Sequence, residues 1–415
     1  MSRTFRSLRH RDYRLYWSGM LVSNVGTWMQ RVAQDWLVLV VLGGGAQAVG
    51  IATGLQFLPF LLVAPFGGLL ADRLPKRTLL LSTNGFLGLL ALVLGALVLT
   101  GAAEIWHVYV LAFLLGVGNA LDNPARQAFV SELVGQHDVS NAVALNSASF
   151  NAARLIGPAA AGGLIALFGT GWLFVLNGLS FAAPIVMLLL LRSAASRAGA
   201  DGAGPLARLR EGIGYVRSRP DLVMVLTVVF GLGTFGMNFQ MTMALMATEV
   251  YHRGPTEYGL LGSVLAVGTL TGALVAARRA FPRLRLIVVG TVIFGVFAVA
   301  AGLMPTYGTF ALALAPIGVL VMTVLTAANG YIQTTVDGHI RGRVLSLYIT
   351  ILMGGTPAGA PVIGWLADAF GARWSLLAGG ALTVLCTLLA VALFVRRTRA
   401  GGRTTGITAS PALRP

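Results

Sequence analysis

Apolar runs of about 20 residues recur along the entire chain and are separated by short polar segments. A helical run of this length crosses the hydrocarbon core of a bilayer. The runs predict an all-α integral membrane protein with twelve transmembrane helices, at residues 15–42, 46–70, 79–100, 105–126, 141–168, 172–191, 221–248, 257–277, 286–304, 309–334, 344–368 and 374–395.

The composition excludes an ordinary soluble protein. Hydrophobic residues make up 56% of the chain, charged residues only 11%, and 53 of its 415 residues are Gly. Soluble domains carry about 25% charged residues and about 7% Gly. The net charge of +16 suits nucleic-acid binding in principle, but the charges lie between the apolar runs. We therefore expect a lipid bilayer around the chain and no nucleic-acid partner.

The distribution of basic residues predicts which side of the membrane each loop faces. If the N-terminus is cytoplasmic, 26 of the 30 Lys and Arg residues lie in inside segments. Only Arg253 and Arg373 lie outside, and Arg31 and Arg154 fall within spans. This asymmetry follows the positive-inside rule, so both termini are expected in the cytoplasm. The basic first 14 residues lack a convincing signal-peptide cleavage site and are expected to be retained.

A Gly/Ala/Ser-rich polar stretch divides the spans six and six. Its second half, from Leu206 to Arg217, is expected to form an amphipathic helix on the cytoplasmic surface. The predicted organisation is a cytoplasmic segment at 1–14, a six-helix bundle at 15–191, a cytoplasmic linker at 192–220, a second six-helix bundle at 221–395 and a disordered cytoplasmic tail at 396–415.

The two bundles share an internal repeat. The segment GPAAAGGLIALFGTGW, which begins at Gly157, matches GAPVIGWLADAFGARW, which begins at Gly359, at a constant offset of 202 residues. Three Gly, one Phe and one Trp coincide, which indicates duplication. We expect two pseudo-symmetric bundles. In transporters built from parallel repeats, the substrate cavity lies between the halves near the middle of the bilayer.

The segment GGLLADRLPKRTLL, which follows the second span, resembles the signature of the major facilitator superfamily. Its residues are Gly68, Asp72, Arg73, Lys76 and Arg77, although Pro75 stands where the family usually has Gly. The resemblance implies a twelve-helix transporter in which Asp72 locks the outward-facing state. It also implies that Lys76 pairs with an acid on the fourth helix, at the position of Asp122. The alternative is a loop that only sets topology.

The fifth span contains Gly157, Pro158 and Gly162, a pattern similar to a signature of drug:proton antiporters in this superfamily. Ala161 departs from that signature, and a general packing face of small residues is the alternative. Further segments, such as WSGMLVSNVGTWMQRVAQDWLVL and ALDNPARQAF, resemble the bacterial exporter branch that includes macrolide-efflux and enterobactin-export proteins. The resemblance implies the inner membrane of a bacterium as the location.

Three ionisable residues lie deep inside spans, away from their ends: Arg31, Asp35 and Arg154. Such residues are costly in a bilayer and usually mark a functional path. We hypothesise that Asp35 accepts the proton, that Arg31 or Arg154 tunes it, and that substrate and proton occupy it alternately. The alternative is a structural ion pair between Arg31 and Asp35, which share a helix face. Two Arg against one Asp favour neutral or anionic substrates.

Polar side chains within the spans are candidates for the wall of the cavity, and the alternative for each is a hydrogen bond between helices. They are Gln34, Gln56, Asn151, Asn177, Asn238, Gln240, Asn329, Tyr331 and Gln333. The seventh span also contains Met237, Met241, Met243 and Met246, whose flexible side chains suit a promiscuous pocket or a packed stripe.

The sequence contains no Walker loop and no catalytic or metal-binding cluster, so we expect neither an enzyme nor a cofactor. Without an ATP site, an ion gradient or facilitated diffusion remains, and the resemblance of the fifth span to drug:proton antiporters implies a proton gradient as the energy source. The function expected is secondary active export of an amphipathic small molecule, such as a drug, a macrolide or a siderophore, by proton antiport, in a monomer. The alternatives are a proton symporter or uniporter that imports a metabolite, and a membrane sensor on the same scaffold.

Overall fold

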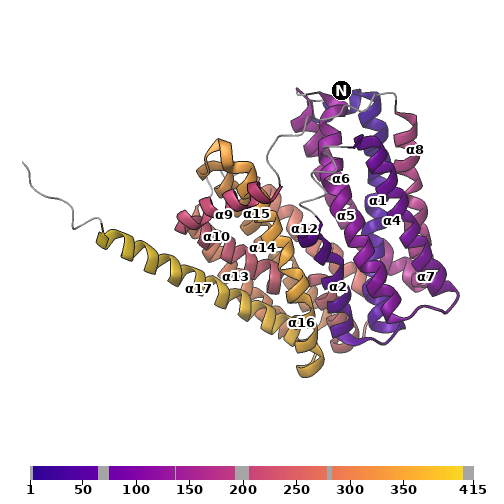
Figure 1. Ribbon diagram of the computed structural model, residues 1–415. Coiled ribbons are helices and arrows are strands. Elements are labelled where there is room, and N and C mark those ends of the chain that lie inside the picture. Colours follow the sequence, from indigo (N-terminus) through magenta and orange to yellow (C-terminus); the bar gives the residue numbers. More distant parts are fainter. Residues whose placement is uncertain (1–2, 64–73, 136, 192–204, 278–282, 405–415) are drawn as a thin grey trace, which may run out of the picture.

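The computed structural model describes residues 3–63, 74–135, 137–191, 205–277 and 283–404. Within these ranges every regular element is a helix. The first half, drawn from indigo to magenta in Figure 1, begins with a short helix η1. It comprises η1 (Arg3–Arg9), α1 (Arg11–Trp36) with its π-helical end η2 (Leu37–Val41), α2 (Gly45–Leu62), α4 (Lys76–Leu99), α5 (Ile105–Val134), α6 (Val139–Phe168), α7 (Thr170–Ser180) and α8 (Ala182–Leu190).

The second half begins with the linker helix α9 and ends with the long helix α17 (Figure 1). It comprises α9 (Pro205–Ser218), α10 (Pro220–Gly231), η3 (Leu232–Gly236), α11 (Phe239–Leu245), η4 (Met246–Val250), α12 (Pro255–Ala277), α13 (Leu284–Gly302), α14 (Tyr307–Thr335), α15 (Gly338–Gly354), α16 (Thr356–Phe370) and α17 (Trp374–Thr404).

Eleven helical segments of the described chain are long and apolar enough to cross a membrane. The expected first span, α1 with η2, is not among them because polar and charged residues, including Arg31 and Asp35, lower its hydropathy. With α1, the segments follow the twelve expected spans in order, which confirms the expected fold class. The expected continuation of the second span to residue 70 lies outside the described residues.

Three expected spans are interrupted rather than continuous. The sixth is interrupted at Phe181, between α7 and α8, and the eleventh is divided at Gly355 into α15 and α16. The seventh breaks at Met237 and Asn238, where the Asn238 side chain donates to the Thr234 carbonyl oxygen at 2.9 Å. The amphipathic helix expected in the linker is present as α9.

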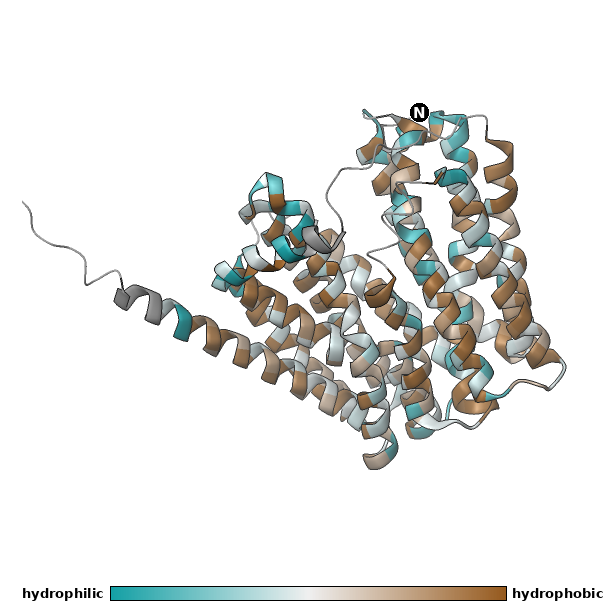
Figure 2. Cartoon of the chain, viewed as in Figure 1, coloured by the Kyte–Doolittle hydropathy of each residue, from teal (hydrophilic) through white to brown (hydrophobic). Residues whose placement is uncertain are grey.

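The two ends of the bundle differ in polarity. We call the end that carries η1 and α9 the linker face, and the end that carries the loops at 42–44, 100–104, 251–254 and 371–373 the far face. Hydrophilic residues gather at the linker face, and hydrophobic residues follow the helices between the two ends (Figure 2). Many large apolar side chains on the outer surface are exposed, such as Leu167 and Leu312, each 75% exposed. A surface of this kind suits contact with lipid.

The halves cross twice near the far face, where α6 packs on α12 and α2 packs on α16. A Cβ atom at Gly162 of α6 would lie 2.4 Å from the Pro255 carbonyl oxygen. A Cβ atom at Gly364 of α16, its partner in the repeat, would lie 2.6 Å from the Ala46 carbonyl oxygen. Both glycines thus allow a helix to approach the start of the second helix of the other half. The repeat seen in the sequence therefore corresponds to equivalent packing.

The two halves are also equivalent in the way that each holds the short helix that precedes it. Asp138, just before α6, binds η1 through His10 Nε2 at 2.9 Å and Arg6 Nε at 2.6 Å. Asp337, just before α15, accepts a hydrogen bond from Tyr215 of α9 at 3.2 Å. Each half therefore holds its leading helix with an acid at the start of its fifth span.

Candidate functional site

A cavity of about 1530 Å³ lies between the halves. Its wall includes residues of α1, α2, α5 and α6 from the first half and of α11, α12, α15 and α16 from the second. At one end it is lined by His339 and Arg343, which lie at the linker face, and by Arg126, which lies deeper on α5. At the other end it reaches Gln34 and Tyr258 and includes no residue of the far-face loops.

The far face is closed by contacts between the halves. At the crossing of α2 and α16, the Asp368 carboxylate accepts hydrogen bonds from the backbone N–H groups of Ala46 and Gln47, at 2.8 and 2.9 Å. It therefore caps the N-terminus of a helix in the other half. At the crossing of α6 and α12, Ser263 Oγ donates to the Leu155 carbonyl oxygen at 2.6 Å. The cavity is thus open toward the linker face and closed toward the far face.

Asp35 lies beyond the closed end of the cavity. Its Oδ2 accepts a hydrogen bond from the Tyr258 hydroxyl of α12 at 3.1 Å, so it connects the two halves. The Tyr258 ring stacks on Trp36, with centroids 6.2 Å apart. Asp35 is only 6% exposed and does not line the cavity. Direct alternation of substrate and proton at this carboxylate therefore does not fit this conformation, because the side chain faces α12.

Arg31 and Arg154 line the cavity on the side of the first half. Their guanidinium carbons lie 4.9 and 5.5 Å from the centroid of the Trp28 ring, within the range of cation–π contact. Arg31 makes no ion pair with Asp35 within 4.0 Å, because Asp35 faces Tyr258 instead. The intrahelical ion pair, the alternative that the spacing of these residues offered, is therefore not formed.

The polar candidates divide into two groups. Five line the cavity: Gln34, Gln56, Asn177, Asn238 and Gln240. The Gln34 amide donates to Gln56 Oε1 at 3.4 Å, and Asn177 donates to Gln30. Four candidates do not line it, namely Asn151, Asn329, Tyr331 and Gln333.

Three of the four residues outside the cavity form hydrogen bonds within their own helix. The Asn151 amide donates to the Ser147 carbonyl oxygen at 2.8 Å, one turn earlier on α6. Asn329 and Gln333 bond to each other along α14. Their expected place in the cavity wall is therefore corrected, because hydropathy shows that a polar residue is embedded but not which way it points.

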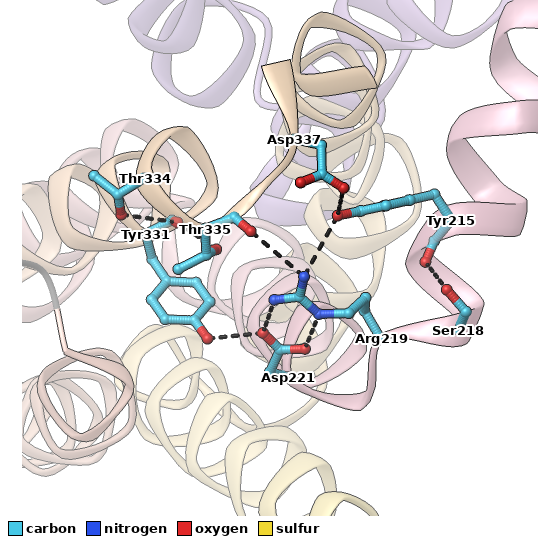
Figure 3. A network of polar contacts seen from close by, with 8 residues as sticks. All are labelled: Tyr215, Ser218, Arg219, Asp221, Tyr331, Thr334, Thr335 and Asp337. Carbon is cyan, nitrogen blue, oxygen red and sulfur yellow. Dashed lines mark hydrogen bonds and ion pairs between the residues drawn. The ribbon is translucent and has the colours of Figure 1, made fainter. Parts of the chain in front are cut away.

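Tyr331 belongs instead to a polar network at the linker face (Figure 3). The Arg219 guanidinium donates to Asp221 at 2.9 and 2.7 Å, and the Tyr331 hydroxyl donates to Asp221 Oδ2 at 2.7 Å. The hydrogen bonds to Asp221 raise the pKa of Arg219 above its ordinary value. Arg219 also donates to the Thr335 carbonyl oxygen and to Tyr215. The network fixes α9 and α10 to the end of α14.

The antiporter-like residues of the fifth span lie where α6 meets two other helices. A Cβ atom at Gly157 would lie 2.6 Å from Trp28 Cβ, so this glycine lets α1 and α6 approach at the Trp28 ring. Pro158 lines the cavity and packs against Gly259 and Gly262 of α12. Gly162 packs on the start of α12. The motif therefore sets helix packing next to the cavity and across the boundary between the halves.

The facilitator loop signature is described only in part. Gly68, Asp72 and Arg73 lie outside the described residues. Lys76 forms an ion pair with Glu132 of α5, and the Arg77 guanidinium donates to the Leu189 carbonyl oxygen at 2.9 Å.

The acid that pairs with Lys76 is on the expected helix but at another position. Lys76 begins α4 at the linker face and meets Glu132 in the last turn of antiparallel α5. Asp122 lies roughly three turns deeper. There it pairs with Arg126, at 2.8 Å from Nε, and accepts from Thr83 Oγ1 at 2.7 Å.

Comparison with known proteins shows the family. The family described as transmembrane secretion effector matches residues 2–406. The chain belongs to this family of the major facilitator superfamily. It is a multi-pass membrane protein and, like the transporters of this superfamily, not an enzyme.

Transporters of this superfamily resemble the chain over most of its length. The multidrug efflux pump Tap of Mycolicibacterium fortuitum is 28% identical, over 91% of this chain and 94% of that protein. The staphyloferrin A transporter of Staphylococcus aureus is 23% identical, over 90% and 94%. A solved bacterial homologue of the human lysosomal transporter Spinster, inward-facing and unoccupied, has a TM-score of 0.70 at 16% identity, over 93% of this chain and 98% of that one. This likeness shows the shared facilitator fold.

Two aromatic residues next to the embedded charges, Trp28 and Tyr258, could not be singled out from the sequence. Trp28 and Tyr258 give no signal of their own, because aromatic residues are common in membrane helices. Trp28 precedes Arg31 by one turn, so its place beside that guanidinium could have been inferred from helical spacing. The contact between Tyr258 and Asp35 joins residues 223 positions apart and follows only from the tertiary fold.

Proposed function

We propose that this protein exports an amphipathic small molecule from the cytoplasm by alternating access, driven by protons that move inward. The observation that carries the proposal is the cavity between the halves, open at the linker face and closed at the far face by α2, α6, α12 and α16. A rocking motion of the halves would open the other side. The printed functions of the relatives, a multidrug efflux pump and a staphyloferrin A transporter, support a small-molecule cargo.

The linker face is assigned to the cytoplasm of a bacterial cell with the far face toward the outside. The asymmetry of basic residues supports this orientation, because 26 of 30 fall in segments that the sequence predicts to be cytoplasmic. Substrate then enters the cavity from the cytoplasm or the inner leaflet. The transporter works as a monomer in the inner membrane and uses the proton gradient, with no cofactor.

Asp35 provides the proton coupling in this scheme. Opening of the far face separates α1 from α12, which breaks the hydrogen bond to Tyr258 and brings Asp35 into contact with outside water. A carboxylate is costly to bury, whereas the protonated group is not. Protonation therefore favours the return to the conformation with a closed far face. The proton then leaves through the cavity, helped by the positive charge of Arg31 one turn away.

The test uses everted membrane vesicles from an efflux-deficient bacterial host that maintain a respiration-driven pH gradient. Macrolides, catecholate siderophores and lipophilic dyes are added, and proton release is followed with a fluorescent probe. We expect at least one compound to dissipate the gradient with the wild type and not with Asp35→Asn. Tyr258→Phe keeps the aromatic stack and is expected to weaken the response.

Glu257→Gln is the matched control. It removes an acid beside Tyr258 on α12 whose side chain neither lines the cavity nor bonds to Asp35. This variant is expected to respond as the wild type does. An equal response from Asp35→Asn would place the proton site elsewhere. A wild type that responds to no compound would argue against export by antiport.

A further inference from the structure

The cavity carries an uncompensated positive charge. Among its lining residues, all from the described part of the chain, there are four arginines and neither an aspartate nor a glutamate. Two of the arginines have an acidic partner outside the wall. Arg126 pairs with Asp122, and Arg343 pairs with Glu211.

The other two arginines, Arg31 and Arg154, have no such partner. Neither forms an ion pair or a hydrogen bond with any described residue. The acid nearest to Arg31 along its helix, Asp35, is engaged by Tyr258. Two guanidinium groups therefore face one region of the cavity without an ion-paired anion, and the Asp35 carboxylate one turn from Arg31 balances only one of the two charges, in a part of the protein where an unpaired charge is costly.

The Trp28 ring determines how these two groups are presented. Both guanidinium carbons lie within 5.5 Å of its centroid, although Arg31 comes from α1 and Arg154 from α6. Cation–π contact holds each planar group in place and leaves its N–H donors available. Gly157 keeps the two helices close at this point. The arrangement is a preformed pair of donors for a planar oxyanion, and guanidinium binds carboxylates by paired hydrogen bonds.

Other parts of the cavity wall are apolar. Phe57 and Phe60 line it from α2, and Met237, Met241 and Met243 line it from the second half. Flexible thioether and aromatic side chains accept apolar groups of varied shape. A ligand that satisfies both parts of the wall has a carboxylate at one end and an apolar body.

We propose that Arg31 and Arg154, held by Trp28, form a binding site for the carboxylate of an amphipathic anion, which is the preferred substrate class of this transporter. This inference rests on the proposed function, because it treats the cavity as the path of the cargo. It goes further in assigning the charge of the substrate and the residues that recognise it.

The test measures binding separately from transport. The full-length protein is placed in nanodiscs of phosphatidylcholine, and binding of dansyl-labelled undecanoic acid is compared with binding of its methyl ester by fluorescence. The two probes share an apolar body and differ in the charge of one end. We expect the acid to bind about tenfold more tightly than the ester, as a charge-assisted contact implies.

Variants then assign the difference to the two arginines. In the double variant that carries Arg31→Gln and Arg154→Gln, the acid is expected to bind no better than the ester. Binding of the ester itself should be retained, which would show that the cavity is intact. Arg343→Gln is the matched control, since Arg343 lines the same cavity but is paired with Glu211, and it should keep the preference. Arg31→Lys in place of Arg31→Gln is expected to restore part of the preference for the acid, because the charge returns without the planar geometry.

Three results would overturn the proposal: equal binding of acid and ester to the wild type, no binding of the acid, or a preference that survives in the double variant. A lipid headgroup offers a similar oxyanion, so the measurement is repeated with phosphatidylglycerol in the nanodiscs. If this lipid displaces the acid, the site belongs to lipid and the substrate proposal is wrong. A preserved preference without proton release in vesicles would contradict the antiport and leave the anion site supported.

Discussion

One helical turn separates the Arg31 guanidinium, which faces the cavity, from the Asp35 carboxylate, which faces α12. The two residues have opposite charges and suitable spacing, yet each has a different neighbour. Arg31 lies over Trp28, and Asp35 accepts a hydrogen bond from Tyr258. We infer that the first residue serves the ligand and the second serves the proton, so substitutions of the two should have different effects on binding and coupling.

Asp138 provides a pH prediction outside the spans. The hydrogen bond from His10, supported by the charge of Arg6, holds the pKa of Asp138 below its ordinary value. The docked η1 segment is therefore favoured while this carboxylate is charged. That contribution is complete above the ordinary aspartate pKa of about 4 and is lost as the pH falls through the lower value of the docked state.

Hydrogen–deuterium exchange of the N-terminal peptide, corrected for intrinsic rates, measures this docking. We expect constant protection from neutral pH down to about pH 4 and weaker protection below it. Asp138→Asn should lower protection at neutral pH and remove the acid-dependent step. A step that persists in this variant would show that another group is responsible.

At the level of single residues, the sequence was sufficient to select Arg31, Asp35 and Arg154, because charge inside an apolar run is rare and costly. It was not sufficient to pair them. The spacing of Arg31 and Asp35 favoured an ion pair, and the fold supplied a different partner for each. Asn329 and Gln333 illustrate the same limit, since embedded amides can satisfy each other along one helix and leave the cavity wall to other residues.

At the scale of the helices, the crossings between them depend on glycine at defined positions. Gly162 and Gly163 are adjacent on α6, but only Gly162 faces α12. A Cβ atom at Gly162 would lie 2.4 Å from the Pro255 carbonyl oxygen, whereas nothing lies within 4 Å of one at Gly163. The pair therefore offers a matched comparison of packing at this crossing.

Gly162→Ala is expected to destabilise the protein by about 1–3 kcal/mol, because the added methyl group must push α12 away from α6. Gly163→Ala should be close to neutral. Thermal unfolding followed by the reactivity of Cys386, the single cysteine of the chain, measures both variants. Equal unfolding temperatures for the two variants would show that the crossing tolerates separation.

The positions of the helices followed from apolar length, but their interruptions did not. The breaks near Asn238 and Gly355 occur where other helices approach closely, as at Gly355 and Gly359, where a Cβ atom would collide with Thr234. Such contacts join residues more than 100 positions apart and leave no local pattern in hydropathy. The π-helical end of α1, Leu37–Val41, likewise consists only of apolar residues.

At the scale of the whole molecule, the repeat at offset 202 was sufficient to predict two related halves. Gly162 and Gly364 show why the repeat is visible: both lie where a side chain would collide with the other half. The limits proposed for the linker remain a prediction, whereas the tail expected to be disordered from residue 396 continues as the helix α17 to Thr404. The relative position of the halves was not accessible from one sequence, and under the alternating access that we propose it changes during transport.

The orientation in the membrane is a further prediction at this scale. Ser218→Cys lies at the linker face and Leu303→Cys at the far face, both exposed, in a Cys386→Ala background. In intact cells, a membrane-impermeant maleimide is expected to label the Leu303→Cys variant at once and the Ser218→Cys variant only after permeabilisation. The reverse pattern would show that the cavity opens to the outside in this conformation.

The cap that Asp368 places on α2 makes the two edges of the far face unequal. The equivalent position in the first half, at offset 202, is Ala166, so the edge formed by α6 and α12 has no such carboxylate. Separating α2 from α16 breaks two charge-assisted bonds at once, whereas α6 and α12 can turn about small residues and hydroxyl contacts. We therefore expect the far face to open by rotation about the contact between α6 and α12, while the hydrogen bonds of Asp368 break at the opposite edge. Spin labels placed across the crossing of α2 and α16 should then move apart further than labels across the crossing of α6 and α12. The cargo would leave between α2 and α16.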